Sequence, residues 1–171
     1  MDPDDLVAEL ARLGVAHLRL DHPAVFTVEQ SERLVPPMEG ARTKNLFLRD
    51  KKGRRPLLVV AAHDKRVDLK RLADGVGASG LSFASDARLR EHLGVTPGAV
   101  SILALVNDAA HAVELYVDRD VWAASTILAH PLVNTATLAI PRADLERFLR
   151  HTGHLPRIVD VPTAAPAGAA P

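Results

Sequence analysis

The sequence contains no cysteine among its 171 residues. This absence excludes disulfide bonds, thiolate metal sites and cysteine nucleophiles, and it makes a reducing compartment the simpler expectation. Aromatic residues are scarce, at 4%, so we expect a core built mainly from Leu, Val, Ala and Ile. Net charge is missing too, because the 21 basic and 21 acidic residues cancel. Any contact with nucleic acid must therefore come from a local basic patch.

Long hydrophobic runs are also missing. The longest, such as "PLLVVAA" and "SILALV", fall far short of the ~20 residues that cross a bilayer. The acidic start "MDPDD" does not resemble a signal peptide. We therefore expect a cytoplasmic protein whose length suits one domain around one core.

Helices are expected where capping residues meet apolar residues at helical spacing. Asp2 and Pro3 begin the first, which Gly14 ends; Ser85 caps another, which ends at Gly94. The expected helices span residues 2–14, 27–35, 68–77, 85–94 and 141–153.

Strands are expected in the runs between these helices. Residues 43–62 form two strand-like runs around the turn "DKKG", which predicts a β-hairpin. The apolar run 100–106 and the alternating run 112–118 predict a second hairpin, and "LSFAS" a short strand. We expect an α/β fold, a single compact domain over residues 1–160 with a mixed, largely antiparallel β-sheet flanked by helices. Residues 161–171 are expected to be a disordered C-terminal tail.

Common catalytic motifs are missing. The eight histidines form no His-Glu-x-x-His motif, which argues against a metal enzyme. The segment "GASGLS" has the wrong frame for a nucleophile elbow, and neither a P-loop nor a Gly-x-Gly-x-x-Gly motif is found.

Three features remain. Lys44 and Asn45 place a cation and an amide at the start of a strand, the turn in "GVTPGAVS" can present backbone N–H groups, and His130 precedes Pro131. Taken singly, each has an ordinary structural interpretation as well: a strand end, a plain turn, and a loop histidine with internal hydrogen bonds.

Together, several segments resemble one family. "HPAVFTVEQ", "TKNLFLRDKKGR", "LSFAS", "LGVTPGAVS", "ALVND" and "HPLVNTAT" occur in the order and spacing of the YbaK/ProX family of trans-editing aminoacyl-tRNA deacylases. The resemblance runs from about residue 15 to residue 160 and is closest to the free-standing members associated with prolyl-tRNA synthetase.

This resemblance implies hydrolysis of mischarged alanyl-tRNA for proline, without metal or other cofactor and without a protein nucleophile. The 2′-hydroxyl of the terminal adenosine would help to activate or position the attacking water. The implied catalytic residues are Lys44, Asn45, Gly98, Ala99 and His130. Lys44 would hold a phosphate or the polar end of the substrate, Gly98 and Ala99 would offer backbone donors, and His130 would contact the adenosine or the amino acid.

The resemblance also suggests where substrate and tRNA bind. Val25, Phe26 and Phe47 are expected as pocket walls that exclude proline, and Pro131, Asn134 and Thr135 complete the substrate-binding set, the last two bracing the loop of His130. The expected tRNA contacts are Lys51, Lys52, Arg54 and Arg55. Prolyl-tRNA synthetase or an elongation factor would be transient partners. Esters of cysteine, serine or threonine, or a non-catalytic module that binds tRNA or synthetase, remain alternatives.

Overall fold

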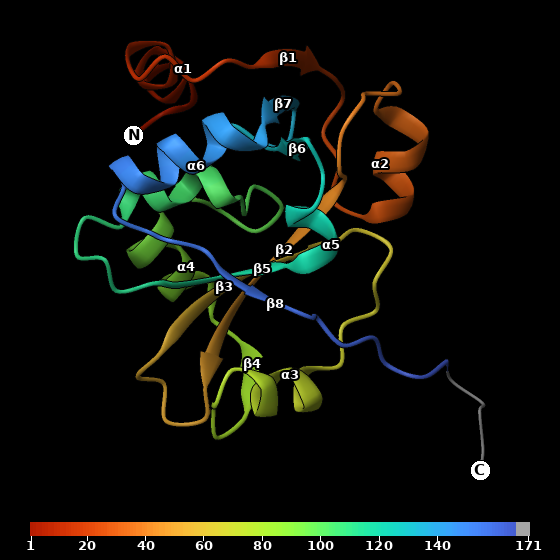
Figure 1. Cartoon of the computed structure of the whole chain (residues 1–171), viewed down its shortest axis with the longest axis vertical. Helices are drawn as coiled ribbons and strands as arrows, with labels where there is room; N and C mark the ends of the chain where they lie inside the picture. The colour runs from red at the N-terminus through yellow and green to blue at the C-terminus, as the bar shows by residue number, and fades with distance from the viewer. Residues whose placement is uncertain (167–171) are drawn as a thin grey trace.

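The computed structural model describes residues 1–166 (Figure 1). Its helices are α1 (Pro3–Arg12), α2 (Val28–Leu34), α3 (Leu69–Gly75), α4 (Asp86–Leu93), α5 (Arg119–Trp122) and α6 (Arg142–His151), with the 3₁₀ helix η1 (Ile102–Asn107). Its strands are β1 (Leu18–Asp21), β2 (Thr43–Asp50), β3 (Pro56–Ala62), β4 (Leu81–Phe83), β5 (Glu114–Asp118), β6 (Thr126–Ala129), β7 (Ala136–Pro141) and β8 (Arg157–Val159). Among these residues, none of the helices has the length and apolar character that a bilayer crossing requires.

The strands form two sheets. One is antiparallel with the order β1-β7-β6, and the other has the order β4-β2-β3-β5-β8. In the second sheet β2 is antiparallel to β3 and β4, whereas β3–β5 and β5–β8 are parallel pairs. The sheets meet at Ala41, whose N–H donates to Thr126 and whose carbonyl accepts from Leu128. The expected α/β class is therefore correct, with the sheet divided in two.

Strand β3 is central because both of its faces are covered. Leu58 and Val60 pack into the larger core cluster, and Leu57, Val59 and Ala61 into a smaller one. Side chains alternate across a strand, so a strand buried on both faces is apolar throughout. This pattern is what "PLLVVAA" encodes.

The expected helices and the first hairpin are confirmed. Asp2 caps α1 by accepting from Asp5 N–H, Thr27 caps α2, and Ser85 caps α4, which ends at Gly94 in the left-handed region. Figure 1 shows α2 at the end of the molecule where β2 begins, and the β2–β3 turn at the opposite end. The length of β2 therefore separates α2 from that turn.

The second hairpin was predicted wrongly. Residues 102–107 form η1, and β5 pairs in parallel with β3 instead. The Ser101 side chain caps η1 by accepting from Leu103 N–H at 3.2 Å. A short, wholly apolar run carries no periodicity that separates a buried strand from a buried helix.

The expected tail also differs from the structure where it is described. Val161 is buried, Pro162 accepts from Asp68 N–H, and Thr163 bridges Val67. Backbone pairing of this kind needs no large side chains, which is why the composition of the segment did not reveal it. Residues 167–171 of that expectation lie outside the described residues.

Candidate active site

A cavity of about 250 Å³ opens where α2, the start of β2 and two loops converge. The loops are the turn before η1 and the β6–β7 connection. The lining residues are Val25, Phe26, Thr27, Val28, Ser31, Arg42, Thr43, Lys44, Asn45, His63, Gly98, Val100 and His130. Six of the residues expected from the sequence thus share one cavity: Val25, Phe26, Lys44, Asn45, Gly98 and His130.

Lys44 and Asn45 enter the cavity from the first residues of β2, opposite Ala61 and Val60 of β3. Partial burial lowers the pKa of the Lys44 ammonium, and Asp64 opposes this shift. In the part of the chain that the structure describes, Lys44 forms no ion pair, and the buried Oδ1 of Asn45 has no hydrogen-bond partner. Both side chains are therefore available to a ligand.

His130 lies at the end of β6, in the loop that leads to β7. Its Nδ1 is 2.9 Å from the carbonyl oxygen of Ala136. A carbonyl can only accept, so Nδ1 carries the proton and Nε2 of the neutral ring is an acceptor. Burial lowers the pKa of His130; the Ala136 hydrogen bond opposes the shift and nearby His22 adds to it. His130 is therefore a neutral acceptor on the cavity wall at pH 7.

The sequence has two His-Pro steps, His22-Pro23 and His130-Pro131, and their histidine rings lie near each other. The His22 and His130 rings are 6.2 Å apart. His22 Nδ1 donates to the Pro23 carbonyl at 2.8 Å, which leaves Nε2 to accept from the Thr137 hydroxyl at 2.9 Å. Both nitrogens of His22 are thus used inside the protein, and the ring joins the 22–25 segment to β7.

The turn before η1 requires its glycine. Gly98 has φ +89°, and Ala99 N–H donates to the Thr96 carbonyl at 3.1 Å. Proline at the second position and glycine with positive φ at the third are typical of a type II turn. Ala99 is also buried, so its N–H is occupied by the turn and the expected role of Ala99 as a backbone donor does not fit. The N–H of Gly98 has no such partner within residues 1–166.

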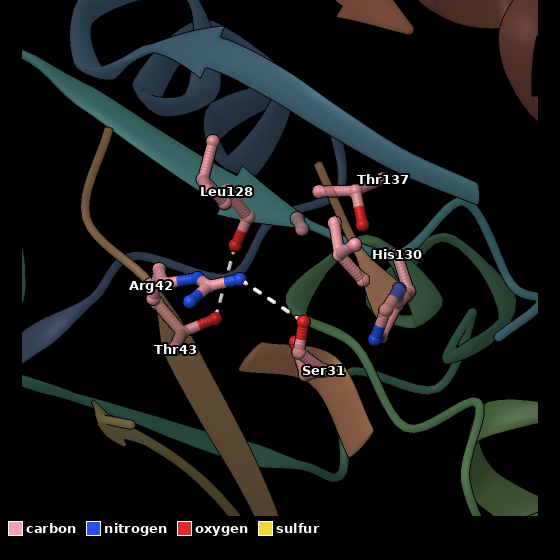
Figure 2. Close-up of a pocket in the computed structure, with 8 residues that line it drawn as sticks. Ser31, Arg42, Thr43, Leu128, His130 and Thr137 are labelled. Carbon is pink, nitrogen blue, oxygen red and sulfur yellow. Dashed lines mark hydrogen bonds between the residues drawn. The ribbon is translucent and has the colours of Figure 1, made fainter. Parts of the chain in front are cut away.

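A smaller pocket of about 40 Å³ continues the cavity inward (Figure 2). It shares Ser31, Arg42, Thr43 and His130 with the cavity and adds Val35, Leu128, Ala129 and Thr137. Figure 2 shows two hydrogen bonds that hold its rim: Thr43 Oγ1 donates to the Leu128 carbonyl at 3.0 Å, and Arg42 to the Ser31 carbonyl at 3.3 Å. A cavity needs about 10–15 Å³ of space open to a water-sized sphere to hold one water, so this inner pocket is on the scale of one small group.

The family model described as an aminoacyl-tRNA editing domain matches residues 22–148. The chain belongs to this family. The match spans most of the chain and includes every lining residue of both pockets. The family and the enzyme class expected from the sequence, an aminoacyl-tRNA deacylase, are thereby confirmed.

Named relatives of this editing domain agree with the match. The "Prolyl-tRNA editing protein ProX" of Acetoanaerobium sticklandii is 36% identical, over 91% of this chain and 95% of its own. The "Prolyl-tRNA synthetase associated domain-containing protein 1" of Danio rerio is 41% identical, over 92% and 88%. The fold matches, with a TM-score of 0.70 and 20% identity, a solved structure described as a proposed trans-editing enzyme for prolyl tRNA synthetase, over 96% of this chain and 99% of that one.

Five expected residues of the editing domain lie outside the cavity, and one of them is Ala99, described above. Phe47 is 4% exposed, in the core, with its ring 5.9 Å from that of His92 on α4. Pro131 is buried beside His130, and Thr135 is exposed, its carbonyl accepting from His22 N–H. Asn134 exchanges two hydrogen bonds with Val25, at 3.1 and 3.2 Å. Asn134 and Thr135 thus hold the loop against the 22–25 segment, the bracing arrangement that the sequence suggested for them.

Sequence reasoning missed several lining residues. Arg42 and Thr43 directly precede Lys44, so their position beside an expected site residue was an available signal. Ser31 and Val35 come from α2 and the residue that follows it, and His63 follows β3, where its ring is 3.5 Å from Glu32. Nothing in the local sequence marks these three. Among the described residues, no group of three or more His, Asp or Glu side chains could hold a metal ion.

The expected tRNA contacts divide into two kinds. Lys51, Lys52 and Arg54 are exposed at the β2–β3 turn. Arg55, in contrast, pairs with both carboxylate oxygens of Glu114 at 2.7 and 2.8 Å and donates to carbonyls after α3. Its hydrogen bond to Glu114 is the main cause that lowers the pKa of that carboxyl to about 2. Arg55 is therefore a structural residue that ties β3 to β5, and the expectation that it contacts tRNA does not fit.

Proposed function

We propose that this editing domain hydrolyses the ester of alanyl-tRNA for proline in trans. The observation that carries the proposal is the convergence of Lys44, Asn45, Gly98 and His130 on one cavity. The names of the relatives, prolyl-tRNA editing protein and prolyl-tRNA synthetase associated protein, support the tRNA for proline. A transient complex with the synthetase or an elongation factor would supply further tRNA identity.

The chemistry requires little more than positioning. Water adds to the ester carbonyl, the bond to the ribose oxygen breaks, and free alanine leaves a tRNA with both terminal hydroxyls. An ammonium at Lys44 and the N–H of Gly98 can stabilise the negative charge on the carbonyl oxygen. The acceptor Nε2 of His130 can orient the α-ammonium group, the water or the 2′-hydroxyl of the terminal adenosine.

Selectivity would come from the inner pocket. Its volume of about 40 Å³ suits the methyl group of alanine, whereas proline carries three ring methylene groups in place of that methyl group. Exclusion by size can exceed the ~1–3 kcal/mol that binding energy gains per methylene. The walls that decide this are Val35, Leu128, Ala129 and Thr137 and not Phe47.

The test compares alanyl-tRNA and prolyl-tRNA, both on the tRNA for proline, with a chelator present. We expect loss of alanine with proline spared. Lys44→Ala should slow the reaction by about 10²–10³-fold, the usual effect of removing one such stabilising donor, and Lys70→Ala, an exposed lysine on α3, is the matched control. A fully active Lys44→Ala protein would overturn the role of Lys44.

Two further outcomes are informative. If neither ester is hydrolysed faster than in buffer, cysteinyl-, seryl- and threonyl-tRNA are assayed next. Binding of charged tRNA without hydrolysis of any ester would instead establish a non-catalytic module. Ser31 lines both pockets and carries a hydroxyl, so full activity of Ser31→Ala is expected if water, and not a protein nucleophile, attacks the ester.

A further inference from the structure

Phe26 is the feature of the cavity that the proposed chemistry leaves unexplained. Its side chain is 68% exposed, although it lines the cavity. A large apolar side chain that packs in a core or walls a tight pocket is normally covered. The exposure of Phe26 argues against the role of a wall that excludes proline and places the ring at the rim.

The backbone on both sides of Phe26 is fixed. Val25 exchanges two hydrogen bonds with Asn134, as described above. Phe26 N–H donates to Gln30 Oε1 at 2.8 Å, and Gln30 N–H donates to the Thr27 hydroxyl that caps α2, at 3.1 Å. The ring therefore extends from a held backbone, which limits the entropy lost when it binds something.

The ring also rests on the turn of Gly98. A Cβ placed on Gly98 would lie 3.1 Å from Cδ1 and 3.5 Å from Cε1 of Phe26. Because Gly98 has no side chain, one side of the Phe26 ring can pack closely against the turn. Most of the ring surface faces solvent. A supported, half-free aromatic ring is suited to stacking against another flat group.

We propose that Phe26 stacks against the adenine of the terminal nucleotide of the aminoacyl-tRNA. This proposal rests on the proposed function. The ester and the adenine base are attached to the same ribose. If the ester lies beside Lys44, the base is therefore only the width of that ribose away, at the rim of the cavity. The chain has no net charge with which to attract the phosphates, and base–aromatic stacking is a common source of affinity for single-stranded ends.

Hydrolysis of alanyl-tRNA gives the first test. Phe26→Leu keeps an apolar side chain but removes the ring, and we expect KM to rise by roughly 5- to 150-fold. Phe26→Trp should keep the wild-type KM. The matched control is Phe83→Leu, which removes an exposed ring on β4 and should change nothing. An unchanged KM in Phe26→Leu would overturn the proposal.

A substrate without the base separates stacking from pocket shape. With alanyl-ribose, the difference between the wild-type protein and Phe26→Leu should shrink toward one. An equal loss on both substrates would mean that Phe26 shapes the site for the amino acid, which also overturns the proposal.

Direct binding distinguishes failure of this inference from failure of the proposed function. The trinucleotide CCA is titrated into wild-type protein and Phe26→Leu by NMR, which needs no hydrolysis. Weaker binding by Phe26→Leu, absent when the third nucleotide is abasic, supports stacking even if no alanyl ester is cleaved. Equal binding by both proteins refutes stacking, as does a wild-type dimer that Phe26→Leu dissociates, because the ring would then contact a second copy.

Discussion

At the scale of single residues, the two His-Pro steps show how similar sequence segments acquire different states. His22 uses both ring nitrogens within the protein, whereas His130 uses Nδ1 alone. Burial opposes protonation of His130, so its pKa lies below the ordinary value of about 6.5. The neutral acceptor form should therefore persist at pH 6.5 and be lost as the pH falls through the lowered pKa.

This state predicts the acid side of the pH profile. The single-turnover rate of alanyl-tRNA hydrolysis, corrected for spontaneous hydrolysis, should be retained at pH 6.5 and should fall only at lower pH. His130→Gln keeps an acceptor that does not titrate in this range, so its slower rate should lose the acid limb. A limb above pH 6.5, or one that survives in His130→Gln, would contradict the assignment.

The residues also show what the sequence could predict about the site. Lys44, Asn45, Gly98 and His130 lie in segments that resemble a family, and the structure brings all four to one cavity. Phe47 shares the alternation of Asn45 along β2, but it lies further along the strand, where α4 covers it. Whether a side chain of a strand is buried depends on which element packs over it, and the sequence of the strand alone does not specify that element.

At the scale of elements, the turn at Gly98 places a residue of positive φ in the lining of the cavity. Gly98→Ala places a Cβ at φ +89° and within 3.1 Å of Phe26. Gly77→Ala, at φ +63° with no atom within 4 Å of its Cβ, has the strain without the close contact. Each should lower the free energy of unfolding by about 1 kcal/mol or more, since alanine is disfavoured at positive φ.

Activity separates the two variants. Only Gly98→Ala should impair alanyl-tRNA hydrolysis, because only its methyl group displaces the rim of the cavity. Urea unfolding and steady-state kinetics measure the two effects separately. Equal activity of the variants at equal stability would show that the turn of Gly98 plays no part in the site.

The elements also show which parts of the fold could be predicted from the sequence. The helices could, because capping residues and terminal glycines are local signals. The run 102–107 forms a 3₁₀ helix, and no edge of β5 is left for it, because β3 and β8 pair with the two edges of β5. That choice depends on pairing between distant strands, to which local sequence contributes little.

At the scale of the whole molecule, the basic and acidic residues cancel, so affinity for tRNA must come from local basic surfaces. Lys51, Lys52 and Arg54 are exposed at the β2–β3 turn, while Arg55 is committed to Glu114. If the three exposed residues contact phosphates, replacing them together by Gln should lower the slope of log affinity against log salt by about 2 to 3. Filter binding over a series of salt concentrations measures this slope, and a triple variant with the wild-type slope would place the tRNA on another face.

Arg55→Gln is the matched substitution at the same turn. It leaves the partly buried carboxylate of Glu114 with Arg157 and Tyr116 as its remaining side-chain partners among the described residues, so the main loss should be stability, about 1.5–3 kcal/mol for hydrogen bonds to charged groups. Because the Arg55 guanidinium is already paired with Glu114, the salt slope should stay at the wild-type value. Opposite results, a changed slope with unchanged urea unfolding, would mean that Arg55 leaves Glu114 to bind tRNA, as the sequence first suggested.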